Sequence, residues 1–346
     1  MGTGHNLAHG AFLPKLCHNA GIPRSFTFAS RALDVPAVKG RASGTPCIAV
    51  AGERGAQAWE IGLKPVPFAY VKASALSQVH QLLDRCGDRA RILAGGQSLM
   101  AALNLRLSTP EVLIDITGLT ELSGIRVVGD RLRIGALTRH CEVETSDLVN
   151  RYAPLIAQAM PHVAHPAIRN RGTFGGSIAF ADPAAELPAC VIALDAEIEI
   201  AGAAGRRRLA AQDFFVGVYE TALQPGEVVT AVEVPMRAPG FHSAFAELAR
   251  RHGDYAMVGL AAHGSCQAGR WRELRLAFFG AGPKPLRARR AEACFLRANL
   301  NAAAIAQAKL DLAKDLDPFD DIHATAATKL YLAGVLLERV VRTLVK

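Results

Sequence analysis

Two consecutive glycines lie in the segment Ala94-Gly95-Gly96-Gln97-Ser98, directly after an apolar stretch that predicts a strand. Glycine adopts positive φ at low cost and lets the backbone approach a ligand closely. Successive amide N–H groups in such a loop can form a concave anion-binding site, and Gln97 and Ser98 add side-chain donors. Taken alone, the pattern is more typical of a tight turn, because glycine is the common turn residue.

The same arrangement recurs downstream in the segment Gly172-Thr173-Phe174-Gly175-Gly176-Ser177. Thr173 and Ser177 can hydrogen-bond phosphate oxygens. Asp182 follows soon after, and a carboxylate beside a nucleotide site commonly accepts hydrogen bonds from ribose hydroxyls, although Asp182-Pro183 is equally typical of a turn start. Two such loops can hold a diphosphate from two sides.

Other motifs with chemistry are missing from the sequence. Neither loop fits G-x-G-x-x-G, and the P-loop, H-E-x-x-H and G-x-S-x-G patterns are absent. His165 can be a base, but a positioning or capping role is more typical of such a histidine. Arg169 and Arg171 can contact phosphates, pin the second loop or face a partner. We therefore expect no catalytic residue and no metal ligand in this chain.

The first loop needs a rigid frame, and the residues around it predict an α/β subdomain. Ser74 can cap a helix that Gly87 would end. The apolar residues of this helix recur with a 3.6-residue period: Leu76, Val79, Leu82, Leu83 and Cys86. Strands are expected at Arg91–Leu93, before the loop, and at Val112–Ile116, after it.

The second loop lies in a region of mixed structure. Gly129-Asp130 predicts a two-residue hairpin turn between strands at Ile125–Val128 and Arg131–Gly135. Further strands are expected at Val191–Ile200 and Val228–Val234.

After Pro239-Gly240 the pattern changes to a third unit, with three antiparallel strands followed by helices. The strands are expected at Phe241–Leu248, Ala256–His263 and Leu274–Phe279, and the helices at Ala302–Leu316 and Ala324–Val345. The fold class is therefore α+β.

The composition is that of a folded globular protein: 346 residues with 50% apolar and 20% charged side chains. No apolar run approaches the ~18 residues of a membrane-spanning helix, so no span is expected. The seven cysteines include no C-x-x-C pair, which argues against a disulfide framework, a zinc site or an iron–sulfur site. A reducing compartment, the cytoplasm, is the simplest interpretation.

The formal net charge is +8, with basic clusters at Arg206–Arg208, Arg250-Arg251 and Arg287–Arg290. No interleaved aromatic residues or nucleic-acid-binding module accompany them, so we expect a solvated face or a dock for an acidic partner, and no nucleic acid. Residues 1–63 lack periodicity and faintly resemble a transit peptide. We expect a disordered extension or non-native upstream sequence there.

Four ordered segments resemble those of one known family, the FAD-binding medium subunit of molybdenum hydroxylases such as carbon monoxide and xanthine dehydrogenases. The residues Arg91–Met100 resemble its first FAD motif, and His165–Ser177 with the tail Ala181–Pro188 resemble its second. Ala249–Ala256 and Gly280–Pro285 resemble two later segments. The similarity runs in order from about Lys64 to the C-terminus.

The resemblance implies a two-subdomain FAD-binding fold of the vanillyl-alcohol oxidase type, over residues 64–238 with subdomains of about 64–120 and 121–238. A C-terminal flavoprotein domain would cover 241–346, with a three-stranded antiparallel sheet and helices. It also implies that the two loops hold the FAD diphosphate, that Asp182 meets the ribose, and that Arg251, Asp254 and Tyr255 lie on the flavin side. The implied FAD-binding residues are Ala94, Gly95, Gly96, Gln97, Ser98, Leu99, Thr173, Phe174, Gly175, Gly176, Ser177, Asp182 and Val229.

The sequence departs from the family pattern at two positions. Phe180 stands where many relatives have histidine or asparagine, and Glu247 aligns where some have a lysine. The cysteines that hold an extra four-iron cluster in some relatives are absent, so no such cluster is expected.

The function implied by the resemblance is electron transfer. A molybdopterin-binding large subunit would hydroxylate substrate, a small subunit with two [2Fe–2S] clusters would pass electrons to the FAD, and NAD, a quinone or oxygen would receive them. The complex would be a heterotrimer or a dimer of heterotrimers. Two alternatives stay open: a stand-alone FAD-dependent oxidoreductase of the same fold, and a binding or assembly protein that has lost FAD.

Overall fold

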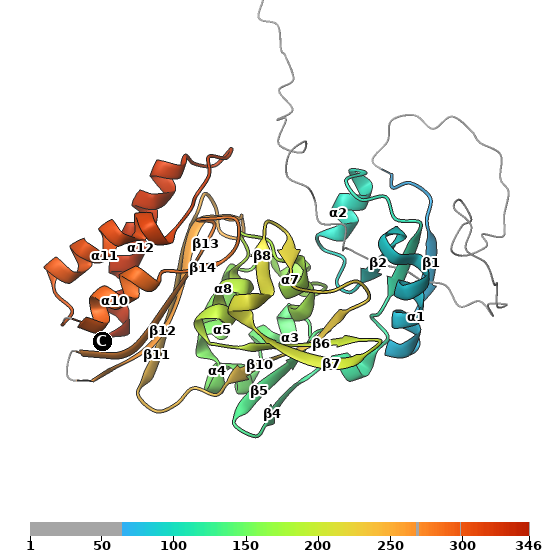
Figure 1. Cartoon of the computed structure of the whole chain (residues 1–346), viewed down its shortest axis with the longest axis horizontal. Helices are drawn as coiled ribbons and strands as arrows, with labels where there is room; N and C mark the ends of the chain where they lie inside the picture. Colours follow the sequence, from blue (N-terminus) through green and yellow to red (C-terminus); the bar gives the residue numbers. More distant parts are fainter. Residues whose placement is uncertain (1–63, 268–269, 298, 346) are drawn as a thin grey trace, which may run out of the picture.

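The structure, a computed structural model, describes residues 64–267, 270–297 and 299–345. The expected N-terminal extension therefore lies outside the described residues. Figure 1 shows three layered parts along the molecule: a small sheet with two helices, a larger sheet under a group of helices, and a C-terminal sheet covered by three helices. This is the mixed helix-and-sheet fold that the sequence predicts.

The first part holds a three-stranded parallel sheet in the order β1-β3-β2. Its elements are β1 (Ala69–Lys72), α1 (Leu76–Cys86), η2 (Gly87–Arg89), β2 (Ala90–Leu93), α2 (Leu99–Asn104) and β3 (Val112–Asp115). Gly87 ends α1 with φ +51°, as expected. Ser74 does not cap this helix: Ala75 occupies the N-cap, and the Ser74 hydroxyl donates to Gln78 Oε1 at 3.2 Å. The polar side chain is thus satisfied one residue before the cap.

The second part is a five-stranded sheet in the order β4-β5-β10-β6-β7. Its strands are β4 (Ile125–Val128), β5 (Arg131–Gly135), β6 (Glu197–Gly202), β7 (Gly205–Ala210) and β10 (Val228–Pro235). The hairpin at Gly129-Asp130 is confirmed. The strand expected over Val191–Ile200 is wrong in its first half, because residues up to Ala193 belong to a helix. The buried residues of that helix run without a break from Leu187 to Ala193, so no helical period is visible in the sequence.

Short helices cover this sheet and carry the second glycine loop (Figure 1). They are α3 (His140–Glu144), α4 (Asp147–Tyr152), α5 (Pro154–Ala159), α6 (Pro166–Arg169), α7 (Phe174–Phe180), α8 (Glu186–Ala193) and α9 (Ala211–Phe214). Two 3-10 turns, η3 (Thr120–Leu122) and η4 (Met160–His162), and a small hairpin of β8 (Phe215–Gly217) and β9 (Glu220–Thr221) complete the part.

The third part corrects the expected sheet, which has four antiparallel strands in the order β11-β12-β13-β14 rather than three. The elements are β11 (Phe241–Ala249), β12 (Ala256–Gln267), β13 (Arg270–Phe279), β14 (Leu286–Arg287), α10 (Arg289–Arg297), α11 (Ala302–Asp315) and α12 (Ala326–Leu344). The fourth strand has two residues, too few to show alternation. Helix α10 was also missed, because its arginines dominate a stretch whose buried positions include only Ala291 and Phe295 among apolar residues.

The C-terminal sheet is packed on both faces. One face joins α10, α11 and α12 in a core that includes Leu276, Phe278 and Leu337. The other contributes Ala261 and Phe279 to the core of the second part. No helix in the described part of the chain is long and apolar enough to cross a membrane.

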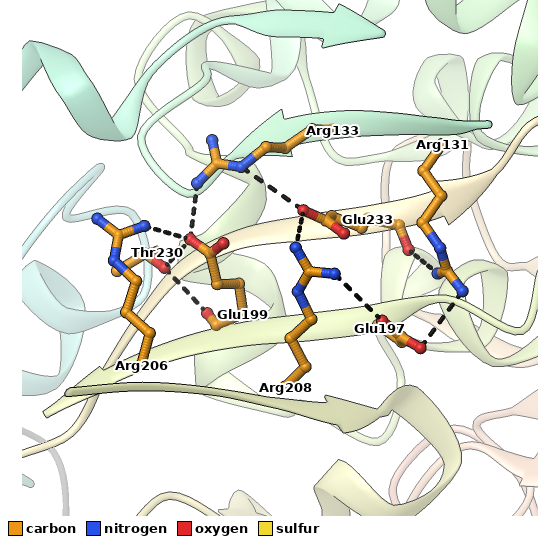
Figure 2. Close-up of polar contacts among 8 residues, drawn as sticks. All are labelled: Arg131, Arg133, Glu197, Glu199, Arg206, Arg208, Thr230 and Glu233. Carbon is orange, nitrogen blue, oxygen red and sulfur yellow. Dashed lines mark hydrogen bonds and ion pairs between the residues drawn. The ribbon is translucent and has the colours of Figure 1, made fainter. Parts of the chain in front are cut away.

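The arginines of β7 form ion pairs within the chain while their side chains stay partly exposed, which is consistent with the expected solvated face; the alternative of a partner dock stays a prediction. Figure 2 shows Arg206 and Arg208 of β7 reaching over the sheet to glutamates on β6 and β10. Arg206 Nη1 lies 2.8 Å from Glu199 Oε1, and Arg208 Nη2 lies 2.9 Å from Glu233 Oε1. Arg206 and Glu199 lie on adjacent strands, which is a favourable cross-strand pairing, whereas Arg208 reaches across β6 to Glu233 on β10.

Candidate functional site

The two glycine loops pack directly against each other at Gly95. A Cβ atom on Gly95 would lie 2.4 Å from the Arg171 carbonyl oxygen and 2.7 Å from Gly172 Cα. Since real Cβ atoms do not approach other atoms so closely, only glycine fits at this contact. The glycine that was expected to make room for a ligand makes room for the other loop.

The first loop presents unpaired backbone donors. The amide N–H groups of residues 95–98 have no acceptor in the part of the chain that the structure describes. Gly96 has φ +70°, and the Gln97 side chain donates to the Gly95 carbonyl at 3.0 Å, which braces the loop. Gln97 and Ser98 are exposed. A run of free amides of this kind binds anions.

The second loop differs, because its amides are occupied. Phe174 N donates to Thr138 O, Gly175 N to Ala136 O, and Ser177 N to Thr173 O. Thr173 Oγ1 accepts from Gly176 N at 3.2 Å and so caps α7. The Ser177 hydroxyl has no partner among the described residues. This loop therefore offers side-chain hydroxyls on a rigid base, rather than backbone amides.

The arginines beside the second loop have different roles. Arg169 is buried, pairs with Glu144 at 2.7 Å and donates to the carbonyls of Val163 and Ala164 at 3.1 Å. It pins the loop and is not free for a phosphate. Arg171 is exposed, and its side chain has no partner within the described ranges. It remains available to an anion at the loop contact.

Segments far apart in the sequence meet around these loops. A Cβ on Gly253 would lie 2.6 Å from the His165 ring, so His165 packs against the backbone of the Arg250–Tyr255 segment. The Gly280 amide donates to the Pro183 carbonyl at 2.8 Å. The four motifs of the sequence analysis thus form one region, and His165 has a packing role there.

Asp182 lies in this region but is largely occupied. Its side chain is buried, and Oδ1 accepts from Ala184 N at 2.9 Å, which is the turn-start geometry. Oδ2 faces the Tyr219 hydroxyl at 3.4 Å, and Tyr255 also interacts with it. Burial raises the pKa of Asp182. Its role toward a ribose stays a prediction.

The apolar residues expected at the site are in the cores. Phe174 is fully buried, and Leu99 and Val229 are nearly so. Val229 lies in β10, which α7 contacts, so it belongs to the base on which the second loop rests. These buried side chains support the two loops from the side of the protein core.

Two titratable residues of the region were not singled out from the sequence. His140 packs against Gly172, and burial lowers its pKa to about 4, although a backbone hydrogen bond at Thr173 opposes this effect. Glu186 begins α8, and burial raises its pKa to about 7. In the sequence, Glu186 is notable only as part of the segment Ala181–Pro188 that resembles the family's second motif. A sequence does not show which charged side chains the fold removes from solvent.

The free amides of the first loop, the hydroxyls of the second and the exposed Arg171 together fit a diphosphate, such as that of a dinucleotide cofactor. Family models agree with this class of site. Residues 66–237 match the FAD binding domain in molybdopterin dehydrogenase, and residues 243–344 match the CO dehydrogenase flavoprotein C-terminal domain. The chain belongs to the family of FAD-binding subunits of molybdenum hydroxylase-type dehydrogenases, and its cofactor is FAD.

Individual relatives are similar over most of the described chain. The 6-hydroxypseudooxynicotine dehydrogenase complex subunit alpha of Paenarthrobacter nicotinovorans is 39% identical over 82% of this chain and 95% of that protein. A solved carbon monoxide dehydrogenase from Hydrogenophaga pseudoflava, lacking the Mo-pyranopterin moiety, contains a chain that is 36% identical. The alignment covers 81% of this chain and 98% of that one, with a TM-score of 0.79. Quinoline 2-oxidoreductase from Pseudomonas putida 86 gives 38% identity, coverage of 81% and 98%, and a TM-score of 0.77.

Proposed function

We propose that the FAD diphosphate is held at the contact between the two glycine loops. The observation that carries this proposal is the run of unpaired amides in the first loop beside the Gly95 contact. In this arrangement residues 95–98 donate from the backbone, and Ser98, Thr173 and Ser177 donate from side chains. The domain division is proposed as an FAD-binding domain of the vanillyl-alcohol oxidase type over 64–238 and a C-terminal domain over 241–346.

We further propose that the chain transfers electrons within a larger complex. Bound FAD supplies the redox chemistry, and this chain holds and orients it. A [2Fe–2S] subunit would deliver electrons from a molybdopterin-binding large subunit, and NAD, a quinone or oxygen would receive them. Support comes from relatives named as medium or alpha subunits of dehydrogenases. Five free cysteines in the described part favour a reducing compartment, the cytoplasm.

The direct test is to purify the full chain alone and with its partner subunits, and to record visible spectra before and after denaturation. We expect one releasable FAD per chain, bleached by the complex's substrate only when the partners are present. A correctly assembled complex without flavin absorbance would refute FAD binding. Bleaching by substrate in the isolated chain would favour a stand-alone oxidoreductase.

Arg171 gives a test of the site's position. Replacing it by alanine removes an exposed cation at the loop contact, and a hydrogen bond to a charged group contributes about 1.5–3 kcal/mol. We therefore expect the Kd for FAD to rise roughly tenfold to a hundredfold, measured by flavin fluorescence titration. Ser177→Ala should raise it only severalfold, because one ordinary hydrogen bond contributes about 1 kcal/mol.

The matched control is Arg126→Ala, an exposed arginine on β4. It removes the same charge from the molecule and should leave the Kd unchanged. Equal weakening by Arg171→Ala and Arg126→Ala would mean that only the net charge matters, and would contradict the proposed position.

A further inference from the structure

The small hairpin of β8 and β9 carries a strained residue at its turn. Gly217 pairs with Glu220 in this hairpin, so Val218 and Tyr219 are the two central residues of the turn. Tyr219 has φ +55°, whereas Val218 does not adopt a positive φ. A turn with positive φ only at its third residue favours glycine or asparagine there. The chain therefore places a bulky aromatic residue where its backbone is strained.

The base of the hairpin is fixed firmly enough to hold this conformation. Phe214 and Phe215 are buried there and pack edge to face, with ring centroids 5.2 Å apart. The Phe214 carbonyl accepts from Ala222 N at 2.8 Å, and the Phe215 carbonyl accepts from Lys284 Nζ at 2.9 Å. Strained residues persist only where the surrounding structure over-determines them, and they cluster at ligand sites. The strain at Tyr219 therefore indicates a functional role.

The strained turn lays the Tyr219 side chain on α7, the helix that starts at the second glycine loop. Its ring packs on that of Phe180, with centroids 4.9 Å apart and a tilt of 54°. Phe180 lies three residues after Ser177, so the two side chains share one face of α7. Tyr219 thus packs on the helix face that carries the Ser177 hydroxyl, one of the proposed FAD donors.

The Tyr219 hydroxyl also faces the Asp182 carboxylate. Asp182 Oδ1 accepts from Ala184 N at 2.9 Å, while Oδ2 lies 3.4 Å from the Tyr219 hydroxyl oxygen. Burial and then the charge of Asp182 raise the pKa of Tyr219, so this hydroxyl keeps its proton and donates at neutral pH. Strong O–H···O bonds are shorter, about 2.5–3.0 Å. The contact therefore restrains Oδ2 and leaves it able to accept from a further donor.

We propose that Tyr219 is a positioning residue for FAD, whose ring and hydroxyl hold Phe180 and the Asp182 carboxylate so that Asp182 Oδ2 can accept from a ribose hydroxyl of the cofactor. This role rests on the proposed function, which places the FAD diphosphate at the start of α7. Tyr219 itself contacts protein groups and acts through Asp182. The strain in the turn is maintained because only this backbone conformation brings the ring onto α7.

Tyr219→Gly distinguishes this role from a merely structural one. Loss of a structural aromatic residue would lower the melting temperature of the chain. Glycine instead releases the strain of the left-handed conformation. We expect the melting temperature of the FAD-free full chain to stay within about 3 °C of the wild type or to rise. The Kd for FAD, measured by flavin fluorescence, should nevertheless rise about tenfold or more.

Tyr219→Phe tests the hydroxyl separately. It keeps the ring on Phe180 and should raise the Kd only severalfold, because it removes one hydrogen bond. In an Asp182→Asn background the same substitution should have no further effect, because the hydroxyl acts through that carboxylate. Asp195→Gly is the matched control: Asp195 has φ +56°, is exposed and follows α8. It releases the same kind of strain and should leave the Kd unchanged.

Three outcomes would overturn the role of Tyr219. They are a melting temperature more than about 3 °C below the wild type in Tyr219→Gly, an unchanged Kd in that variant, and an equal effect of Tyr219→Phe with and without Asp182→Asn. Arg171→Ala, titrated in parallel, keeps the failures distinguishable. An unchanged Kd in Arg171→Ala contradicts the proposed position of the diphosphate, whereas an unchanged Kd in Tyr219→Gly alone refutes only the role of Tyr219.

Discussion

Replacing Gly95 and Gly175 together by valine is expected to abolish FAD binding. The reason is packing between protein segments. A Cβ on Gly95 meets the Arg171 carbonyl at 2.4 Å, and a Cβ on Gly175 meets Ala136 Cβ at 2.4 Å and Cα at 2.6 Å. The three nearest atoms that a Cβ would meet at Gly95 are backbone atoms of Arg171, Gly172 and Thr173, and β5 supports α7 at Gly175. The larger side chains force both loops away from the positions in which their donors converge.

The single alanine variants make this prediction sharper. Overpacking a filled space costs about 1–3 kcal/mol, so Gly95→Ala should weaken FAD binding roughly tenfold to a hundredfold. Gly334→Ala is the matched control, because its added methyl meets nothing closer than the Lys309 Cγ at 3.5 Å. Flavin fluorescence gives the Kd, and circular dichroism tests the fold. Stoichiometric FAD in the double valine variant would show that the loops are not the binding site.

Much of the site's framework was predictable from the sequence, because glycine pairs and hydroxyls occur in short local patterns. The strand before Ala94, the strand after it and the hairpin at Gly129-Asp130 are confirmed by the pairing of β2, β3, β4 and β5. The residue spacing alone predicted a site for any ligand with a diphosphate, and the family resemblance identified that ligand as FAD. Short local patterns, together with the ordered family motifs, were therefore enough to predict the class of protein and its cofactor.

The sequence could not show which hydrogen-bond donors are occupied by contacts between segments that are distant in the chain. Both loops contain a glycine pair, yet one leaves its amides free and the other commits them to Thr138, Ala136 and Thr173. Arg169 and Arg171 are two residues apart, yet one is buried against Glu144 and the other is exposed. Each outcome depends on contacts across the fold, which short-range patterns do not encode.

The arginines of β7 illustrate the same limit. The run Arg206–Arg208 indicates a basic surface when taken alone, because the partner glutamates come from other strands. Arg207 pairs with Glu227 at 2.7 Å, while its neighbours pair with Glu199 and Glu233. Successive side chains of β7 point to opposite faces of the sheet, so Arg207 has its partner on one face and Arg206 and Arg208 have theirs on the other. These partners can be identified only once the order of the strands is known.

The ion pairs of this sheet lead to the largest expected change in stability, for Arg133→Met. Arg133 Nη2 lies 2.7 Å from Glu199 Oε1, and its Nε lies 3.9 Å from Glu233 Oε1 (Figure 2). All three side chains are at most 10% exposed. Removing one partner of a buried pair leaves uncompensated charge and costs about 3–5 kcal/mol. We expect a loss near 3 kcal/mol in urea unfolding at pH 7, because Thr230 and Arg206 still bond Glu199.

The pH dependence of the free energy of unfolding distinguishes the contribution of the Arg133 charge from that of its packing. Burial alone would raise the pKa of Glu199, but hydrogen bonds from Thr230 and Arg133 outweigh it and lower the pKa below 4.5. A depressed carboxyl pKa stabilises the folded state above the unfolded pKa, and this contribution is lost as pH falls through the folded pKa. The difference between wild type and Arg133→Met should therefore be largest at neutral pH and shrink in acid.

Arg206→Met is the control for Arg133→Met, since it removes another cation bonded to the same Glu199 oxygen from a side chain that is 56% exposed. An exposed pair contributes about 0–1 kcal/mol, so this variant should lose at most that much. An Arg133→Met/Glu199→Gln double variant should lose less than the sum of its single changes, because the second substitution removes the charge that the first leaves unpaired. Additive losses that are equal at neutral and acid pH would assign the stabilisation to the packed stem of Arg133 instead of its charge.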